Sequence, residues 1–342
     1  MQTDVVGRAI SYLRKRVGYT QKELADRIGV SDKAVSKWER GLGLPDISLI
    51  GKLAILLDTD TDSLLAGDVI HHDKGWCGLL LLDENAEGIG AYTSIYDKPL
   101  AYYMLSYFML VGIKDIKIIC NDKDRKFFES EFGDGSILGL RLSCWTKLPE
   151  EAFSPECQNV MIVFGKSIIY GVDQTRFFQK AMVDKNRITV LSLPKKNAGA
   201  TSRIYFDSNK KVVSFEDDEQ LKTQYDYYQI PVLFCPKKIT ENIDITFDRI
   251  SEMISRIVQD QVIYTVVLDR GFVEIPIETW NDVSDASMFV KTVQHACGMQ
   301  IYCIEEIAWR RGMISDEAFD LFGEQNAETE HGRYIRNLRK QR

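Results

Sequence analysis

Five polar side chains of types that contact nucleic acids recur within residues 32–40 and share one face of a predicted helix. They are Asp32, Lys33, Ser36, Lys37 and Arg40. Lysine, arginine and serine side chains bind phosphate oxygens and base edges in duplex DNA. Two further candidates are Ser31, just ahead of this stretch, and Gln21, at the start of a preceding predicted helix, where a phosphate can be gripped. The pattern predicts contact with duplex DNA.

Five short helices are predicted to position these side chains. Apolar residues at helical spacing, together with capping residues, predict helices over residues 6–16, 20–29, 32–40 and 46–57 and a short fifth helix around residues 64–65. Thr20 and Glu23 form a capping box, and Gly29 can supply the left-handed stop. Two helices separated by a tight glycine-containing turn are the helix-turn-helix pattern.

The charge of the chain is unevenly distributed. The net charge is -7, yet residues 1–67 carry five lysines and five arginines against nine acidic residues. The remainder is therefore acidic, and an acidic body is repelled by phosphates. We expect the DNA contact to be confined to the N-terminal module and doubled by dimerisation.

Three segments of this module resemble the Cro/C1-type (Xre-type) repressor family. They read Thr-Gln-Lys-Glu-Leu-Ala at residues 20–25, Gly-Val-Ser at 29–31 and Val-Ser-Lys-Trp-Glu-Arg-Gly at 35–41. The resemblance implies that the second helix of the motif lies in the major groove. The alternative is a small helical interaction module that no longer binds DNA.

From Gly78 the pattern changes to alternating strands and helices. Apolar runs predict strands over residues 78–82, 115–120, 160–164 and 188–193, with a helix that opens at Asp97 and further helices over 122–131 and 174–182. More strands are expected near residues 203–207, 211–215, 229–235 and 263–268, and helices dominate after Asn281. The alternation predicts a mostly parallel sheet in an α/β domain. Residues 68–77, which include His71 and His72, are predicted to be a solvated linker between domains at 1–67 and 78–342.

The body also resembles the sugar nucleotidylyltransferases, closest to glucose-1-phosphate thymidylyltransferase, from about residue 78 to residue 338. The segments that carry the resemblance are residues 96–99, 102–106, 109–116, 133–136, 139–140, 170–171, 298 and 305–310. It implies a Rossmann-like α/β nucleotidyltransferase-type domain with a helical C-terminus. The expected fold class is therefore α + α/β, with a five-helix Cro/C1-type module in front.

Several positions depart from the pattern that this family needs. Its chemistry requires a glycine-rich loop with an arginine for the triphosphate, and carboxylates for Mg²⁺. The loop here holds Asp83, Glu84 and Glu87 and no basic residue before Lys98. Lys166 and Pro276 stand at the two metal positions, Asp217-Asp218-Glu219 replaces the segment that holds the sugar phosphate, and residues 147–152 replace the base-reading loop. These departures predict a domain that is not an enzyme; the alternative is a different metal arrangement using Asp83 or Glu278.

The resemblance also implies a regulatory nucleotide pocket at a subunit interface. The matching positions are Leu110, Tyr170, Gly171, Ile301, Glu306, Ile307 and Arg310. Arg310 could pair with phosphate, and Glu306 could accept a hydrogen bond from base or sugar. The alternative is that these residues only pack the helical C-terminus against the sheet, since Glu306 and Arg310 are also an i, i+4 helix pair.

The seven cysteines lack any Cys-x-x-Cys pair, which indicates reduced thiols in a cytoplasm. Cys297 and Cys303, the closest pair, are interpreted as core packing, and no metal or cofactor site is predicted. No run of about 18 apolar residues exists, so no membrane segment is expected. The first residues, Met1-Gln2-Thr3-Asp4, do not resemble a signal peptide.

Together these features predict a sequence-specific DNA-binding transcriptional regulator. Its C-terminal domain is expected to form a homodimer or homotetramer and to sense a nucleotide-sugar effector, of deoxythymidine type. Two alternatives stay open: an active sugar-1-phosphate nucleotidylyltransferase with an attached DNA-binding domain, and a ligand-free oligomerisation scaffold.

Overall fold

The computed structural model describes residues 2–17, 19–57, 59, 61–67, 75–82, 87–195, 203–214, 226–241 and 261–340. The chain divides into two compact units, residues 1–72 with 308–315 and residues 73–307 with 316–342. The predicted linker lies outside the described residues from 68 to 74. Its last two residues, Trp76 and Cys77, belong to the first strand of the second unit.

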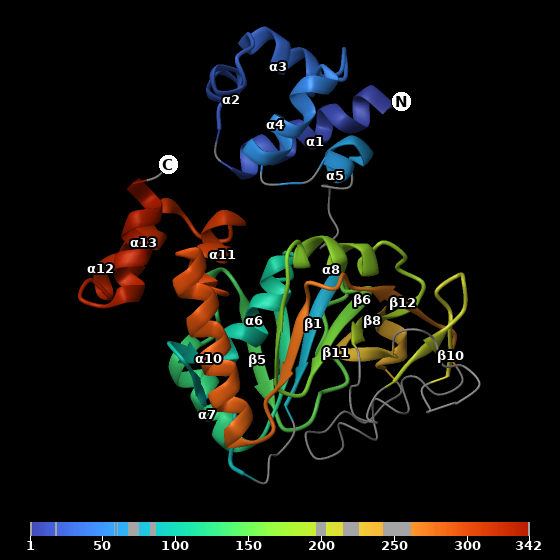
Figure 1. Cartoon of the computed structure of the whole chain (residues 1–342), viewed down its shortest axis with the longest axis vertical. Coiled ribbons are helices and arrows are strands. Elements are labelled where there is room, and N and C mark those ends of the chain that lie inside the picture. The colour runs from blue at the N-terminus through green and yellow to red at the C-terminus, as the bar shows by residue number, and fades with distance from the viewer. Residues whose placement is uncertain are drawn as a thin grey trace. The chain divides into compact units, whose positions relative to one another are not determined.

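The first unit contains the five predicted helices (Figure 1). They are α1 (Gln2–Arg16), α2 (Gln21–Ile28), α3 (Asp32–Glu39), α4 (Ile47–Leu56) and α5 (Thr61–Ala66). α1 begins four residues earlier than the sequence predicts. Its inner face joins the other helices in one apolar core, in which Leu13, Leu24, Val35 and Leu53 are fully buried. Burial of each such side chain contributes roughly 1.5–3 kcal/mol, so packing rather than helix propensity holds these short helices.

A seven-stranded sheet forms the centre of the second unit, in the order β12-β8-β11-β6-β1-β4-β5. The strands are β1 (Trp76–Leu81), β4 (Asp115–Ile119), β5 (Arg141–Trp145), β6 (Asn159–Phe164), β8 (Ile188–Lys195), β11 (Asp226–Pro236) and β12 (Ile263–Val267). β11 pairs antiparallel with β6 and β8, and the remaining neighbours are parallel. The predicted mostly parallel α/β sheet is confirmed.

Three two-stranded sheets accompany this central sheet. They pair β2 (Ser94–Ile95) with β3 (Lys98–Pro99), β7 (Ser167–Tyr170) with β13 (Val273–Pro276), and β9 (Tyr205–Phe206) with β10 (Val212–Ser214). The predicted helix start at Asp97 is corrected here. Pro99 has an extended backbone at φ -60° and ψ 150°, so the helix starts at Leu100, after the β2–β3 pair.

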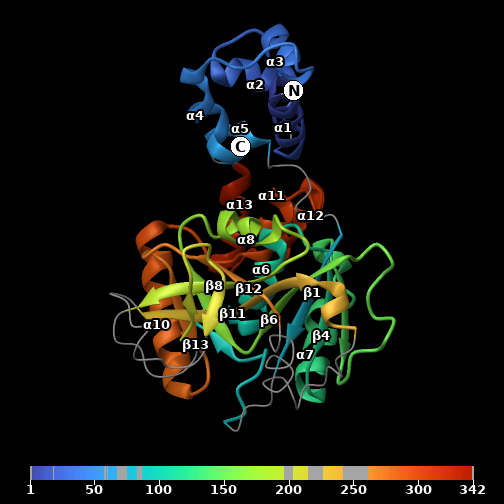
Figure 2. The same ribbon diagram turned by 90° about the vertical axis from the view of Figure 1, so that its right-hand side faces the viewer.

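The helices of the second unit are most closely spaced along its C-terminal part, as predicted. They are α6 (Leu100–Leu110), α7 (Asp122–Phe132), α8 (Gln174–Met182), α10 (Trp280–Cys297), α12 (Asp316–Gln325) and α13 (Glu330–Lys340), together with the start of α11 (Ile304–Arg310), whose residues from Ala308 onward are grouped with the first unit. Figure 2 shows the sheet with helices around it. Among the described residues, no helix has the length and apolar content needed to cross a membrane.

The alternation of side chains along the strands fills both faces of the sheet. On one face, Leu79 and Leu81 pack in a cluster with Ile162 and Leu233. On the other face, Gly78 lies against α6, because a Cβ atom at this position would come within 2.7 Å of the Phe108 ring. The ring centroids of Phe178 on α8 and Phe234 on β11 are 6.1 Å apart, so α8 also contacts the sheet.

Candidate functional site

The start of α2 and the turn between α2 and α3 are built by the residues that the sequence marks as caps. Thr20 Oγ1 accepts a hydrogen bond from Glu23 N at 3.1 Å, and Glu23 Oε2 accepts one from Thr20 N at 2.7 Å. Gly29 ends α2 in the left-handed region at φ 88°. Ser31 Oγ then accepts from Ala34 N at 3.2 Å and starts α3. The Ser31 hydroxyl is therefore already engaged in capping the helix.

The outer face of α3 carries the predicted DNA-contacting side chains. Asp32, Lys33, Lys37 and Arg40 are exposed and Ser36 is half-buried, while Val35 and Trp38 face the core. Arg40 is the C-terminal cap, and its Nε donates to the Ser36 carbonyl at 3.2 Å. Lys33 and Lys37 are one helical turn apart on the same side. This face offers cations and hydrogen-bond donors of the kinds that contact phosphates and base edges.

A buried ion pair fixes α3 against α1, and a hydrogen bond joins α2 to the same carboxylate. Arg14 of α1 donates to Glu39 of α3, with 3.0 Å between Nη2 and Oε2, and also to the Tyr19 carbonyl at 2.6 Å. Gln21 of α2 donates from Nε2 to Glu39 Oε2 at 2.8 Å. The structure thus places the Gln21 amide on Glu39, at the joint of the three helices. We call Arg14, Gln21 and Glu39 the three-helix joint.

The charge of Glu39 is maintained by its partners. Burial disfavours the ionised carboxylate, but hydrogen bonds from Arg14 and Gln21 and the Arg14 charge outweigh it, so the pKa of Glu39 lies below its usual value. The side chains of Arg14 and Glu39 are 9% and 6% exposed. Loss of either partner would leave the other charge buried without compensation.

Part of the predicted regulatory pocket is brought together at the end of β7. The Tyr170 ring contacts Phe289 of α10, with centroids 5.7 Å apart, and Tyr302, at 6.3 Å. Burial raises the pKa of Tyr170. The next residue, Gly171, has no room for a side chain, because a Cβ atom there would lie 2.5 Å from the Phe272 ring.

The other predicted pocket residues lie on α6 and around α11. Leu110 ends α6 and is half-buried, and Ile301 is buried, with its backbone N–H donating to Gln294 Oε1 at 2.7 Å. Glu306 Oε2 accepts from the Tyr334 hydroxyl of α13 at 2.6 Å. Ile307 is half-buried, and Arg310 is exposed at the end of α11. Glu306 therefore already has a protein partner in this structure.

A cavity of about 340 Å³ lies between the start of α13 and the C-terminal end of α10. The residues that line it include Tyr96, Asp97, Gln294, His295, Gln300, His331 and Tyr334, and none of the seven predicted pocket positions. Asp97 accepts a hydrogen bond from Gln294 Nε2 at 3.1 Å, and the Tyr96 hydroxyl is 3.1 Å from His295 Nε2. The sequence analysis interpreted residues 96–99 as family anchors and as a helix start, and did not connect them with α10 or α13.

The positions matched to the metal aspartates of the resembled family lie close together, Lys166 directly before β7 and Pro276 at the end of β13. Lys166 is buried, and its carbonyl accepts from Ile277 N at 2.7 Å, while Pro276 pairs with Ser167. Neither Lys166 nor Pro276 has a side-chain oxygen, so this pair does not fit Mg²⁺. Asp83 and Glu84, and the segment Asp217-Asp218-Glu219, lie outside the described residues. Glu278 is described, and its backbone N–H donates to Asp282 Oδ2 at 3.1 Å.

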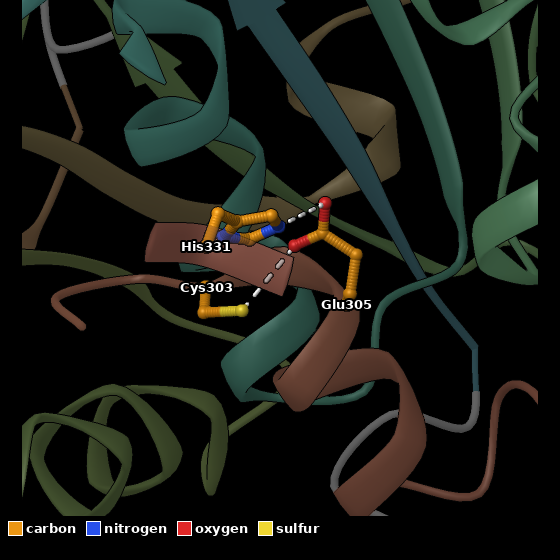
Figure 3. A group of neighbouring side chains, drawn as sticks. All are labelled: Cys303, Glu305 and His331. Carbon is orange, nitrogen blue, oxygen red and sulfur yellow. Dashed lines mark hydrogen bonds and ion pairs between the residues drawn. The ribbon is translucent and has the colours of Figure 1, made fainter. Parts of the chain in front are cut away.

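The structure differs for the two cysteines that the sequence analysis assigned to core packing, Cys297 and Cys303. Cys303 is buried, as core packing requires, but Cys297 is exposed at the end of α10. Cys303 instead lies beside Glu305 and His331 (Figure 3). Sequence analysis did not identify this group, because His331 lies far along the chain from Cys303 and Glu305 and the three follow no known ligand spacing.

Comparison with known families matches both units. Residues 10–64 match the family described as helix-turn-helix, and residues 92–297 match the family described as nucleotidyl transferase. The resemblances inferred from the sequence, Xre-type in front and nucleotidyltransferase-type behind, are confirmed.

Curated relatives match over most of the second unit. Glucose-1-phosphate thymidylyltransferase from Neisseria meningitidis is 29% identical over 72% of this chain and 90% of its own length. The protein of the same name from Mycolicibacterium smegmatis is 28% identical over 71% of this chain and 89% of its own. Among solved structures, HddC from Yersinia pseudotuberculosis shows 14% identity and a TM-score of 0.45 over 63% of this chain and 98% of that one.

These matches correct one prediction. The departures at the phosphate loop and at Lys166 and Pro276 led to the expectation that the domain is not an enzyme. That expectation is contradicted, because the family is one of transferases and the relatives are named as thymidylyltransferases.

Proposed function

The chain belongs to the nucleotidyl transferase family, and from this membership, together with its helix-turn-helix unit, we propose that it is a sequence-specific DNA-binding transcriptional regulator whose transferase-family domain binds a nucleotide sugar. In this proposal residues 1–67 contact an operator. Residues 78–342 bind the ligand and form a homodimer or homotetramer.

The observation that carries the DNA-binding half is the outer face of α3. Lys33, Lys37 and Arg40 are exposed on it, and the three-helix joint holds the helix from behind. A helix with exposed cations on one face and a fixed inner face can enter the major groove without reordering. Because residues 1–67 carry little net charge, affinity should depend on these few cations and on two copies acting together.

The DNA-binding half is tested with the purified full-length protein. Selection from a random duplex library, followed by fluorescence anisotropy on the selected site and on a scrambled site, should give a specificity ratio of about 10³ or more at physiological salt. Equal affinity for both duplexes would contradict sequence-specific binding.

The ligand-binding half is supported by the relatives, whose names specify a sugar 1-phosphate and a thymidylyl group. We propose that Leu110, Tyr170, Gly171, Ile301, Glu306, Ile307 and Arg310 contact the ligand, with Arg310 on phosphate. If the ligand favours one DNA-binding state, it shifts operator affinity, and DNA shifts ligand affinity by the same factor.

A thermal-shift screen with deoxythymidine and uridine sugar nucleotides tests this half. A ligand at 100 times its Kd should add about 2.7 kcal/mol to stability. We expect Arg310→Ala to remove both this shift and any ligand effect on operator binding, while DNA affinity without ligand stays unchanged. Arg333→Ala, an exposed arginine on α13, is the matched control. A full shift in Arg310→Ala would place the ligand elsewhere.

A second candidate function is favoured by the family match itself. In it, the protein is an active sugar-1-phosphate nucleotidylyltransferase with an attached DNA-binding domain. The test is pyrophosphate release from deoxythymidine triphosphate and glucose 1-phosphate with Mg²⁺. Pyrophosphate release that requires both substrates would establish catalysis. A thermal shift with the sugar nucleotide but no pyrophosphate release would indicate ligand binding without catalysis.

A further inference from the structure

We propose that Cys303, Glu305 and His331 form a zinc-binding site that joins the start of α11 to the start of α13. The three side chains converge in Figure 3 from two helices that are separated in the sequence by α12. The proposal depends neither on DNA binding nor on the nucleotide-sugar ligand.

The spacing of the donor atoms fits a single small cation. One ligand atom from each residue lies within 4.8 Å of the other two. Glu305 Oε1 is 3.2 Å from His331 Nε2, and Glu305 Oε2 is 3.3 Å from Cys303 Sγ. Ligands about 2.0–2.3 Å from a tetrahedral zinc ion are roughly 3.3–3.8 Å from one another. Modest closure of this group would therefore bring all three atoms to coordination distance.

The chemistry of the donors selects zinc over Mg²⁺ or Ca²⁺. A thiolate and an imidazole prefer borderline-soft ions, whereas the hard ions prefer oxygen ligands alone. The charges also balance, because a thiolate, a carboxylate and a neutral imidazole around Zn²⁺ sum to zero. This balance matters here, since Cys303 and Glu305 are almost completely buried, with 2% and 6% exposed.

The orientation of His331 gives a second, independent indication. Its Nδ1 lies 2.7 Å from Gln300 Oε1, which can accept a hydrogen bond from it, and its Nε2 lies 3.2 Å from Glu305 Oε1. Without a metal, a proton on Nε2 can serve the contact with Glu305; a bound zinc ion would replace this proton and take the Nε2 lone pair. Metal-binding histidines are held in this way, by a hydrogen bond from the second ring nitrogen to an oxygen acceptor.

The site also has room for a fourth ligand. His331 lines the cavity of about 340 Å³, from which a water molecule could complete a tetrahedron. Close by, the Tyr334 hydroxyl donates to Glu306, which forms a second tie between α11 and α13. A bound zinc ion would add a stronger link between α11 and α13 beside this hydrogen bond.

The experiment titrates Co²⁺ into the full-length protein after treatment with a chelator. We expect one equivalent to bind, with the visible absorption of tetrahedral cobalt and a near-ultraviolet thiolate-to-metal charge-transfer band, and Zn²⁺ to displace it. Cys303→Ser should abolish the charge-transfer band, and His331→Gln should weaken binding. Gln300→Ala should weaken it by about 10–100-fold. The matched controls are Cys297→Ser and His295→Gln, a thiol and an imidazole of α10 outside the group.

Either of two results would overturn the proposal. In the first, the wild-type protein binds no cobalt. The three side chains would then be joined only by the ion pair and hydrogen bond that the structure shows. The other is a charge-transfer band that persists in Cys303→Ser and disappears in Cys297→Ser. Because the wild-type spectrum decides the first point, the proposal remains testable even if a variant fails to fold.

Discussion

The two units of this protein fix their elements relative to one another by different kinds of buried interaction. In the first unit, α1, α2 and α3 meet at a charged joint, Arg14 with Gln21 and Glu39. In the second unit, α6 meets its neighbours through aromatic rings and hydroxyls. Tyr107 contacts Phe178 and Tyr302, and its hydroxyl donates to the Ser167 carbonyl at 2.9 Å.

The difference follows from the size of each core. The first unit has few large side chains, so a buried ion pair with defined geometry specifies how its short helices cross. The second unit has enough apolar volume to be specified by packing, and its polar aromatic groups find backbone partners. The Tyr302 hydroxyl, for example, lies within hydrogen-bonding distance of the Ile169 backbone carbonyl and of the Gln174 side-chain oxygen, to one of which it donates its proton. Single substitutions should therefore act through uncompensated charge in the first unit and through steric fit in the second.

The largest effect is expected from Glu39→Ala. It leaves the Arg14 guanidinium buried without its counter-charge, which typically costs about 3–5 kcal/mol. Hydrogen exchange of the α1–α3 amides, followed by mass spectrometry on the whole protein, measures the loss locally. The control is Asp4→Ala, which removes the exposed Asp4–Arg8 pair and should change stability by less than about 1 kcal/mol. Similar exchange in both variants would contradict a special role for the three-helix joint.

The next effect tests the outer face of the same helix. Lys37→Ala combined with Arg40→Ala should weaken operator binding by about a hundredfold or more, since each good contact contributes about 1–3 kcal/mol. The oligomeric state and the exchange of α1–α3 should not change, because both side chains are exposed. Anisotropy titrations measure the affinity, with exposed Lys180→Ala and Lys291→Ala as controls in the second unit. Unaltered operator affinity in the double variant would place the DNA contact on another face.

A smaller effect is expected from steric fit in the second unit. Gly171→Ala would push a methyl group to 2.5 Å from the Phe272 ring, and such overpacking costs about 1–3 kcal/mol. The matched control is Gly271→Ala, at the residue immediately before Phe272. A Cβ atom at Gly271 would meet nothing within 4 Å. Chemical denaturation with a probe of the second unit compares the two. If both variants were equally stable, the close approach at Gly171 would have no energetic role.

The smallest effect is the pH dependence of the three-helix joint. The pKa of Glu39 is lower in the folded protein than its usual value, so its contribution is complete above the unfolded-state pKa. It is lost as the pH falls through the folded pKa. Acidification below about pH 4.3 should therefore increase exchange in α1–α3, and Glu39→Gln should flatten this part of the profile. An unchanged profile in the glutamine variant would assign the acid sensitivity to other carboxyls.

The comparison also explains how much of the molecule the sequence predicts. The first unit was predicted almost element by element, because Thr20, Gly29 and Ser31 act on their immediate neighbours. The order of the large sheet depends on contacts between distant segments. β5 was missed, since Arg141-Leu142-Ser143-Cys144-Trp145 contains no continuous apolar run.

The same distinction applies to the candidate sites. The exposed face of α3 follows from helical spacing alone, so its residues could be named in advance. The partner of Gln21 could not, because Glu39 lies one helix away and follows no local rule. Cys303, Glu305 and His331 come together only when α13 folds back beside α11.

The three-helix joint has a consequence for how any ligand could control transcription. Because Arg14, Gln21 and Glu39 hold α3 against α1 and α2, we expect the DNA-binding unit of the proposed regulator to move as one rigid body when a ligand binds. In the proposed dimer, a ligand would then change operator affinity by altering the distance or angle between the two DNA-binding units. The measurement is binding to operators whose two half-sites are separated by different numbers of base pairs. Ligand should change which separations are bound, while the preferred bases in each half-site stay the same.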